Sequence, residues 1–502
     1  MDFLILNPLN FPILSTLIFL PLAGALVIFL LKNETVAKVW TLLISLVTMV
    51  LSWPLYFYFD ASTYKYQFGE HLSWIPFFKI NYTLGVDGIS LLLVLLSTLL
   101  TPICILSSWK YISKRVREFL FCLMLMETAC IGVFSALDFV LFYIFWEAML
   151  VPMYLLIAVW GGPEKVYASI KFFIYTMAGS VFLLVAMIAL FLKTGTFSIP
   201  EMMSQPYSFQ FQFWIFLAFA IAFAIKVPMA PFHTWLPAAH VEAPTAGSVI
   251  LASILLKMGT YGFLRFCLPI TPEASIYFAP LILIISVISI SYGGYVALGQ
   301  TDMKRLIAYS SVAHMGFVTL GTFVFNKNGI EGAILQMINH GITTGALFLC
   351  VGIIYERTHS RLITVNSGIG KIMPLYVGLF GFFSLSSMAF PGTNSFVGEL
   401  LVLIGTFTGH KVFGFLTIPG VVLAAAYMLR LLQKIAWGER EEGESHHFFD
   451  LNVREFVYLV PLALLVLWIG FAPAPFLDVM HATVDHLIQQ VQAGGQAVAW
   501  LR

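Results

Sequence analysis

The sequence predicts an all-α polytopic membrane protein. Of its 502 residues, 60% are hydrophobic and only 10% are charged, whereas soluble domains contain about 25% charged residues. Apolar runs of about 20 residues, the length of helix that spans a bilayer, recur along the whole chain. Because these runs are apolar at every position rather than at alternate positions, they favour helices over a transmembrane β-barrel.

Fourteen segments are long and apolar enough to cross a membrane, so residues 1–502 are expected to form a single transmembrane domain. The predicted spans are residues 11–31, 36–58, 86–108, 118–135, 138–160, 167–192, 211–235, 246–268, 275–298, 303–325, 330–355, 373–408, 413–437 and 456–473. The longest predicted loops are 59–85 and 438–455. Residues 475–490 carry apolar side chains at helical spacing, which predicts an amphipathic surface helix.

The positions of the 26 lysines and arginines predict how the chain is oriented. If the N-terminus lies outside, 17 of them fall in inner loops, 7 (Arg265 among them) fall on the outer side, and Lys226 and Lys257 fall inside spans. Loops rich in lysine and arginine stay on the cytoplasmic or matrix side. The sequence therefore predicts that both termini lie on the outer side. No basic residue precedes the first apolar run, so we expect a retained first helix rather than a cleaved signal peptide.

Several ionisable residues lie inside the predicted spans. Charged groups at mid-bilayer cost about 2.5–3.5 kcal/mol each and mark ion or proton paths. The alternative to a transport role for each residue is an ion pair or hydrogen bond that only holds helices together. This structural alternative stays open for Glu127 and for the histidines. The residues in question are Glu127, Glu147, Lys226, Lys257 and Glu399, with His314 and His340 near the centres of their spans.

Helix breakers accompany two of these residues. Pro228 and Pro231 follow Lys226, and Pro391 with Gly392 precedes Glu399. Broken helices expose backbone groups that can hold water and ions, and paired breaks in two halves of a chain indicate a transport site. Proline can also merely kink a helix.

The two breaks suggest an internal repeat. They fall in the seventh and twelfth spans, five spans apart, so residues 118–268 and 275–437 are predicted to be two five-helix repeats with the seventh and twelfth helices discontinuous. An odd number of spans per repeat means that the second repeat is inverted in the membrane.

A buried amine next to a mobile carboxylate is a proton switch. Moving Glu147 toward or away from Lys226 would change how tightly the lysine holds its proton. Lys257 would receive the proton, and Glu399 would be the last station before the outer side. We expect a chain of polar side chains and water in the membrane plane, with Glu147 and Lys226 within about 6 Å of each other. His314 and His340 could relay the proton, because imidazole accepts and donates near neutral pH, and Ser310, Ser311, Thr343 and Thr344 could anchor water or simply join helices.

Other residue types do not indicate a site. The five cysteines have no CxxC or metal-binding spacing, which predicts core- or lipid-facing thiols and places any redox chemistry in another chain. His446 and His447 lie in an acidic loop, and His233 and His240 flank a predicted connection. Asp87 is expected to cap a helix. The net charge of +1 gives no indication of nucleic-acid binding.

Three segments resemble a known family. FWEAMLVPMYLL, KVPMAPFHTWLPAAHVEAPTAGSVILASILLK and GVDGIS are similar to the antiporter-like membrane subunits of respiratory complex I, and most similar to the M-type subunits of NADH-quinone oxidoreductase, the family of mitochondrial subunit 4. The likeness covers essentially the whole chain. It implies fourteen helices, two inverted repeats, and proton translocation coupled to NADH oxidation by quinone. It also implies roles for Glu147 and Lys226 as a modulating pair, Lys257 as central lysine, Glu399 as exit carboxylate, and His314 and His340 as a connecting polar axis.

The resemblance also implies partners and a location. Antiporter-like L and N type subunits would be neighbours in the bilayer, and NAD, FMN, iron–sulfur clusters and quinone would be bound by partner subunits rather than by this chain. The amino-acid sequence of the WEAMLVP segment resembles that of bacterial proteins, which predicts that the chain lies in a bacterial inner membrane. Ala238 stands where family members often have aspartate.

Alternative functions remain open at this point. The L and N subunits, and multisubunit sodium/proton antiporters, usually carry lysine where this chain has Glu399. A subunit of a multisubunit cation/proton antiporter, or of a membrane-bound hydrogenase or formate hydrogenlyase complex, is the alternative function, and a purely structural membrane scaffold is the third.

Overall fold

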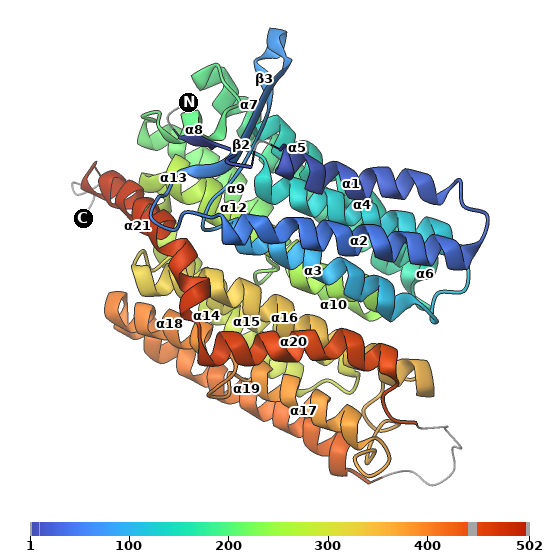
Figure 1. Ribbon diagram of the computed structural model, residues 1–502. Coiled ribbons are helices and arrows are strands. Elements are labelled where there is room, and N and C mark those ends of the chain that lie inside the picture. Colours follow the sequence, from blue (N-terminus) through green and yellow to red (C-terminus); the bar gives the residue numbers. More distant parts are fainter. Residues whose placement is uncertain (1–2, 10, 440–448, 498–502) are drawn as a thin grey trace.

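Long helices form the body of the molecule (Figure 1). The structure is a computed structural model that describes residues 3–9, 11–439 and 449–497. Within these residues, eleven helices are long and apolar enough to cross a membrane, and three shorter apolar helices accompany them. The predicted all-α membrane fold class is therefore confirmed. His446 and His447 lie outside the described residues.

Helices occupy the predicted spans of the N-terminal half, with ends that differ by a few residues. Asparagine and aspartate side chains begin several of them, as Asn33 does by accepting hydrogen bonds from the backbone N–H groups of Thr35 and Val36. The helices are α1 (Ile13–Ile28), α2 (Glu34–Phe57), α3 (Leu91–Ser108), α4 (Val116–Ser135), α5 (Phe139–Ala148), α6 (Leu150–Trp160), α7 (Lys165–Thr194), α8 (Ile199–Met203), α9 (Phe209–Lys226) and α10 (Trp235–Glu242).

The next span is one continuous helical segment interrupted by two π-helical turns. It consists of α11 (Thr245–Ile250), the π turn η2 (Leu251–Leu255), α12 (Leu256–Gly262), the π turn η3 (Phe263–Cys267) and α13 (Leu268–Ile270). Every residue of this segment from Ala246 to Ile270 is buried. Arg265 is therefore a buried residue of this helix rather than part of an exposed loop, and its assignment to the outer side stays a prediction. π turns occur frequently at functional sites.

The C-terminal half repeats the pattern of long helices. Asp302 and Asn326 begin two of these helices by accepting hydrogen bonds from backbone N–H groups. The helices are α14 (Pro272–Leu298), α15 (Met303–Thr322), α16 (Lys327–Thr358), α17 (Pro374–Ser387), α18 (Asn394–Gly409), α19 (Lys411–Trp437), α20 (Val453–Phe471) and α21 (Ala474–Ala497).

Two helices are interrupted at the predicted breakers. The first break separates α9, which ends at Lys226, from α10, and it contains Pro228 and Pro231. Proline has no N–H group for the helical hydrogen-bond ladder, so the helix cannot continue through this segment. The second break separates α17 from α18, where Gly392 has a φ of +89°. Glycine adopts this left-handed conformation without a steric penalty.

A small sheet replaces the predicted loop at residues 59–85. Strand β2 (Tyr66–Ile75) pairs antiparallel with β3 (Ile80–Val86), and β1 (Leu4–Leu6) runs parallel to β2. The sequence predicts only a loop between spans here, because this segment alternates polar and apolar residues instead of forming an apolar run. The sheet and α21 lie at the same end of the bundle, which we call the hairpin end (Figure 1).

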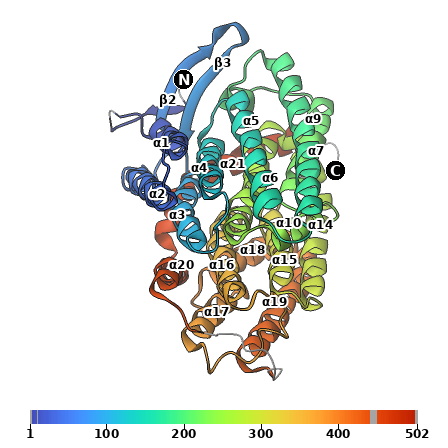
Figure 2. The same cartoon turned by 90° about the vertical axis from the view of Figure 1, so that its right-hand side faces the viewer.

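Two groups of helices make up the bundle. Seen nearly along the helix axes, α5, α6, α7 and α9 lie in the upper part and α15–α19 in the lower part (Figure 2). The two parts meet where Gly341 of α16 packs on Ser253 of η2, whose Oγ donates a hydrogen bond to the Gly341 carbonyl at 2.7 Å. Helix α21 contains the predicted segment 475–490 and packs along the hairpin end, against Gly88 before α3 and against Pro272 at the start of α14.

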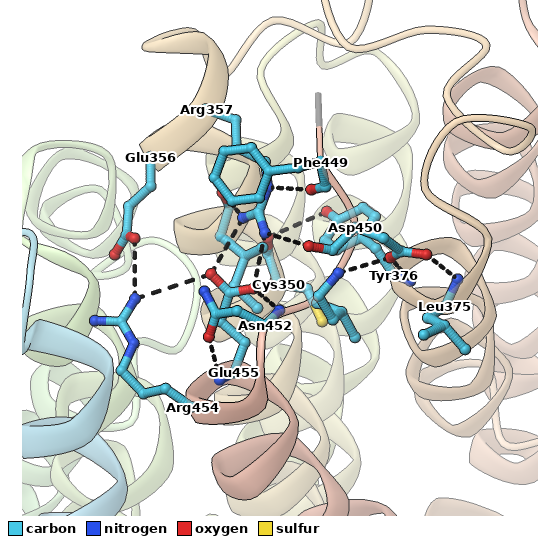
Figure 3. Close-up of polar contacts among 12 residues, drawn as sticks. Cys350, Glu356, Arg357, Leu375, Tyr376, Phe449, Asp450, Asn452, Arg454 and Glu455 are labelled. Atoms are coloured by element: carbon cyan, nitrogen blue, oxygen red, sulfur yellow. Dashed lines mark hydrogen bonds and ion pairs between the residues drawn. The ribbon is translucent and has the colours of Figure 1, made fainter. Parts of the chain in front are cut away.

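A buried ion pair joins the last turn of α16 to the first turn of α20 (Figure 3). The guanidinium of Arg357 lies 2.7 Å from the Glu455 carboxylate, and both side chains are 1% exposed. Arg357 also donates from Nε to the Phe449 carbonyl at 2.8 Å, and the Phe449 ring covers its guanidinium. Glu455 in turn completes a capping box with Asn452 at the start of α20. We call Arg357 and Glu455 the α16–α20 clamp.

The hairpin itself is tied to the first helix by a carboxylate. Glu70 of β2 accepts hydrogen bonds from the backbone N–H groups of Leu14 (2.8 Å) and Ser15 (3.1 Å), and from the Ser15 hydroxyl. These are N–H groups that the first turn of α1 leaves without a helical partner. Burial raises the pKa of the Glu70 carboxyl, although these hydrogen bonds act in the opposite direction.

Candidate proton-relay site

Lys226 is the last residue of α9 and lies at the first helix break. Its side chain is 2% exposed, and its Nζ lies 5.1 Å from the centre of the Trp146 ring. Nζ has no hydrogen-bond partner among the described residues. A cation over the face of a tryptophan is stabilised by the ring electrons, so Trp146 supports the ammonium without fixing it in a hydrogen bond.

Glu147 follows Trp146 near the end of α5. Its side chain is half-buried, and its Oε1 atom is buried without a hydrogen-bond partner in the described part of the chain. The α5 helix ends at Ala148, whose carbonyl cannot receive a helical hydrogen bond because Pro152 lacks an N–H group. The predicted separation of about 6 Å between Glu147 and Lys226 stays a prediction.

The helix that carries Lys257 packs closely against the end of α9, which carries Lys226. A side-chain carbon at Gly259 would lie 2.9 Å from the backbone nitrogen of Val227 and 3.0 Å from Cβ of Lys226. Only a residue without a Cβ allows α12 to approach the end of α9 this closely. The structure therefore brings the segment that carries Lys257 against the segment that carries Lys226.

Lys257 directly contacts a histidine of the other half. Its side chain is 0% exposed, its Nζ donates a hydrogen bond to the Ala252 carbonyl at 2.6 Å, and the same Nζ lies 2.5 Å from Nδ1 of His340. His340 Nε2 has no partner among the described residues. The two side chains are 83 positions apart in the sequence, and this contact links the first half of the chain to the second.

His314 and Glu399 form the second buried pair. Nδ1 of His314 lies 2.8 Å from Oε1 of Glu399, and both side chains are buried. Gln336 donates from Nε2 to the same Oε1 atom at 3.0 Å. The rings of His314 and His340 are 5.8 Å apart between centres, a gap that one water molecule can bridge between ring nitrogens.

Polar side chains surround the second helix break. Asn394 at the start of α18 accepts hydrogen bonds from Ser386 (2.6 Å) and Thr343 (3.2 Å), and its carbonyl accepts one from Asn339 (2.8 Å). Oδ1 of Asn339 is buried without a partner among the described residues. The break therefore contains a polar cluster within reach of His340, which follows Asn339.

The candidate water-anchoring residues divide into two groups. Ser310 and Ser311 donate to the Ile307 carbonyl of their own helix, which is the ordinary structural use of such hydroxyls. Thr343 joins α16 to Ser386, at the end of α17, and to Asn394. Thr343, unlike Ser310 and Ser311, takes part in the polar cluster at the second break, and Thr344, the fourth candidate, is buried.

Sequence reasoning missed several polar residues of this site. Gln336 and Asn339 lie within the apolar span 330–355, and their polarity at that depth was a usable signal. His240, assigned to a connection, is a fully buried residue of α10 that stacks on Phe348, and neither of its ring nitrogens has a partner in the described residues. Glu127 is buried with both carboxylate oxygens unpartnered within the described residues, and it lies outside the contacts of the relay.

Four residues thus form a nearly continuous series across the middle of the chain: Lys257, His340, His314 and Glu399. Hydrogen-bond contacts join the first two and the last two, and one gap separates the histidines. All four side chains are buried. Such a series of donors and acceptors can carry protons but has no room for a large substrate. We call it the relay series.

Family models match most of the chain. Residues 136–424 match the family described as NADH:quinone oxidoreductase/Mrp antiporter, TM, and residues 15–132 match NADH-ubiquinone oxidoreductase chain 4, amino terminus. The chain is 44% identical over 482 residues to NADH-ubiquinone oxidoreductase chain 4 of Marchantia polymorpha, covering 95% of this chain and 97% of that protein. It is 44% identical over 500 residues to NADH-quinone oxidoreductase subunit M of Rhodobacter capsulatus, covering 96% and 97%.

Solved structures share the fold. A chain of respiratory complex I from Thermus thermophilus with bound NADH superimposes with a TM-score of 0.88 at 29% identity, over 95% of this chain and 99% of that chain. A chain of the Mrp complex from Dietzia sp. DQ12-45-1b gives a TM-score of 0.82 at 21% identity, over 97% of this chain and 56% of that chain. At 21% identity the second likeness concerns the fold alone.

Proposed function

The chain belongs to the family of NADH-quinone oxidoreductase subunit M and NADH-ubiquinone oxidoreductase chain 4, and from this premise we propose that it carries protons through the relay series as a membrane subunit of respiratory complex I. The observation that supports the relay series most strongly is the contact between Lys257 and His340. It joins two halves of the chain through a pair of buried groups that can each hold a proton.

Each residue has a distinct role in the proposed path. Glu147 and Lys226 form the modulating pair, in which the position of the carboxylate determines how tightly the amine holds its proton. Lys257 receives the proton, because α12 packs against the end of α9 at Gly259. His340 and His314 pass it on, and Glu399 releases it toward the outer side.

Unpartnered atoms on the path residues support transport over a purely structural role, but they do not by themselves mark the path, since Glu127 and His240 also have unpartnered atoms among the described residues. A side chain that locks helices together has its hydrogen bonds satisfied, because an unsatisfied buried polar atom costs about 1–3 kcal/mol. Lys226 Nζ, Glu147 Oε1 and His340 Nε2 have no partner in the described part of the chain. In a proton path, each of these atoms can bind the transferred proton or a water molecule that carries it.

The experiment that tests the modulating pair measures proton pumping by the whole complex in liposomes. Glu147→Ala and Lys226→Ala should leave the complex assembled but lower the number of protons moved per electron. Glu127→Ala is the control, since it removes another intramembrane carboxylate, which is fully buried and lies outside the relay contacts. Normal pumping in both pair variants, or an equal loss in the control, would refute the assignment.

The architecture and orientation belong to the same proposal. We propose that α15 and the shorter helices complete fourteen crossings, arranged as two inverted five-helix repeats at residues 118–268 and 275–437. The distribution of lysine and arginine places the hairpin end, with both termini, on the outer side. Helix α21 lies along that surface, and the membrane is a bacterial inner membrane.

Redox chemistry is assigned to other chains of the complex. All five cysteines are buried and free, so we propose that NAD, FMN, iron–sulfur clusters and quinone are bound by partner subunits and that L and N type subunits are neighbours. Co-purification separates this proposal from the alternative of a stand-alone cation/proton antiporter. Subunits that react with NADH and quinone should accompany the chain, and their absence would favour the antiporter.

A further inference from the structure

A cavity of about 280 Å³ opens at the hairpin end and leads into the first half of the chain. Tyr64 and Ser204 line it and are exposed, whereas Tyr66, Asp87 and Arg265 line it and are buried. The elements that meet there include β2, α13 and α21, all of which lie at the same end of the bundle (Figure 1). The cavity thus connects the surface to a buried arginine.

Arg265 is held in place on all sides. Its guanidinium lies 2.7 Å from Asp87 Oδ1, donates from Nη1 to the Tyr66 hydroxyl at 2.8 Å, and donates from Nε to the Tyr261 hydroxyl at 3.1 Å. The rings of Tyr66 and Tyr261 lie 5.0 and 5.2 Å from its central carbon. Arg265 and Asp87 are 5% and 1% exposed, so the Arg265 guanidinium is held away from bulk water by its partners.

The arginine lines the cavity and belongs to the same helical segment as the central lysine. Lys257, Tyr261 and Arg265 follow one another at intervals of four residues, and the hydrogen bond between Arg265 and Tyr261 shows that these two share one face of the helix. Eight residues of helix correspond to about 12 Å. Over that distance the Tyr261 ring packs against Phe134 and Phe142, with ring centres 5.3 and 6.4 Å apart.

A guanidinium interrupts proton transfer for two reasons. A group that relays protons must accept one hydrogen bond and donate another, but arginine has five N–H donors, no acceptor, and does not lose its proton in proteins. Its fixed positive charge also repels a hydrated proton, as arginines do in pores that exclude protons. Asp87, 2.7 Å from the guanidinium, reduces this repulsion, so the lack of a hydrogen-bond acceptor on Arg265 is the stronger of the two reasons.

We propose that Arg265, positioned by Asp87, is an electrostatic barrier that closes the route between Lys257 and the hairpin-end cavity. A proton on Lys257 is then directed along the relay series to Glu399 instead of leaving through the first half. This inference rests on the proposed function, because it assigns Arg265 a role only if Lys257 carries protons.

The test measures passive proton flow through the assembled complex in liposomes, with an imposed pH difference and no NADH. In Arg265→Gln combined with Asp87→Asn, both charges are removed while hydrogen-bonding groups of similar size remain. We expect the leak to rise at least about tenfold, the change produced by a loss of about 1.4 kcal/mol of barrier. Arg265→Lys keeps the cation and should stay as tight as the unmodified complex.

A third substitution shows whether the leak uses the central lysine. Adding Lys257→Met to the leaky variant should return the leak to the level of the unmodified complex. A leak that persists would mean that protons pass elsewhere, and an assembled variant without a leak would mean that Arg265 is no barrier. Lower pumping without a leak would mean that Arg265 belongs to an exit path. Each of these three results would overturn the proposal.

A chemical variant tests the role of the charge at position 265 independently. Arg265→Cys with Asp87→Asn creates a thiol facing the cavity, while the five native cysteines are buried. A positively charged thiol reagent should lower the leak and an uncharged reagent of similar size should not; equal effects would contradict the barrier. The pumping defects of Glu147→Ala and Lys226→Ala are measured separately, so failure of the barrier and failure of the proposed function give different results.

Discussion

Removal of Arg357 should destabilise the chain strongly, because it leaves a buried carboxylate without its partner. Arg357 and Glu455 are each 1% exposed and 2.7 Å apart. Breaking a buried ion pair by removing one partner costs about 3–5 kcal/mol. Arg454 lies 3.8 Å from the same carboxylate, too far to replace the lost hydrogen bonds. We therefore expect Arg357→Leu to fall within this range.

A second substitution separates the charge from the packing. Glu455→Gln keeps the capping box at the start of α20, since glutamine also serves at that position, and it removes the charge. In Arg357→Leu combined with Glu455→Gln, the remaining loss comes from hydrogen bonds to the carbonyls of Phe449 and Asp450. The Ile353 carbonyl also loses a bond from Arg357 Nη1 but keeps its helical partner within α16. At about 1 kcal/mol for each bond, we expect a total of about 1–2 kcal/mol.

The assay is thermal unfolding of the complex in lipid nanodiscs, followed by loss of the intact chain. A change of 1 kcal/mol shifts Tm by about 2–4 °C in a domain of 150–250 residues and by less in a longer chain. Arg357→Leu should therefore lower Tm by about 3–10 °C, and the double variant should recover more than half of that loss. Equal losses in the single and double variants would refute the reasoning.

Two further predictions concern packing and pH. Gly259→Ala should separate α12 from α9, because the added carbon would lie 2.7 Å from Val227 Cγ2. We expect a loss of about 1–3 kcal/mol in stability together with reduced proton pumping. A variant that pumps normally would contradict the close approach of the two helices. Burial raises the pKa of Glu70, so the folded state binds the proton of this carboxyl more tightly than the unfolded state does. As pH rises through that pKa, deprotonation of Glu70 therefore lowers the free energy of unfolding. The Tm of Glu70→Gln relative to the unmodified chain should therefore increase between pH 4.5 and pH 7, and a decrease would show that the hydrogen bonds from α1 outweigh burial.

The helices and the two breaks could be predicted because they depend on local chemistry. A run of about 20 apolar residues must be a helix in lipid, and Pro228 and Pro231 interrupt the hydrogen-bond ladder wherever they occur. The hairpin at 66–86 could not be recognised in the same way, because its strands combine polar and apolar residues and are ordered by pairing with each other. The burial of Arg265 could not be predicted, because sequence alone does not reveal that Asp87, 178 positions away, pairs with it.

The relay residues could be predicted as single positions but not as contacts. Lys257, His314, His340 and Glu399 are conspicuous because each is ionisable within an apolar span. Their order depends on how α12 packs against α16, and α15 against α18, which no sequence pattern specifies. Gln336 was missed for the same reason, since its role is apparent only from its hydrogen bond to Glu399.

In the proposed mechanism, buried side chains transfer protons through the middle of the molecule. His340 tests this mechanism most directly, because it contacts Lys257 and its ring lies next to that of His314. The measurement is the number of protons moved per electron by the complex in liposomes. Glutamine at position 340 keeps hydrogen bonding but cannot bind and release a proton, and loss of such a group slows proton transfer by about 10²–10⁴-fold. We expect His340→Gln to lower the ratio while His233→Gln, a buried histidine outside the relay series, leaves it unchanged. An unchanged ratio in His340→Gln would contradict the account.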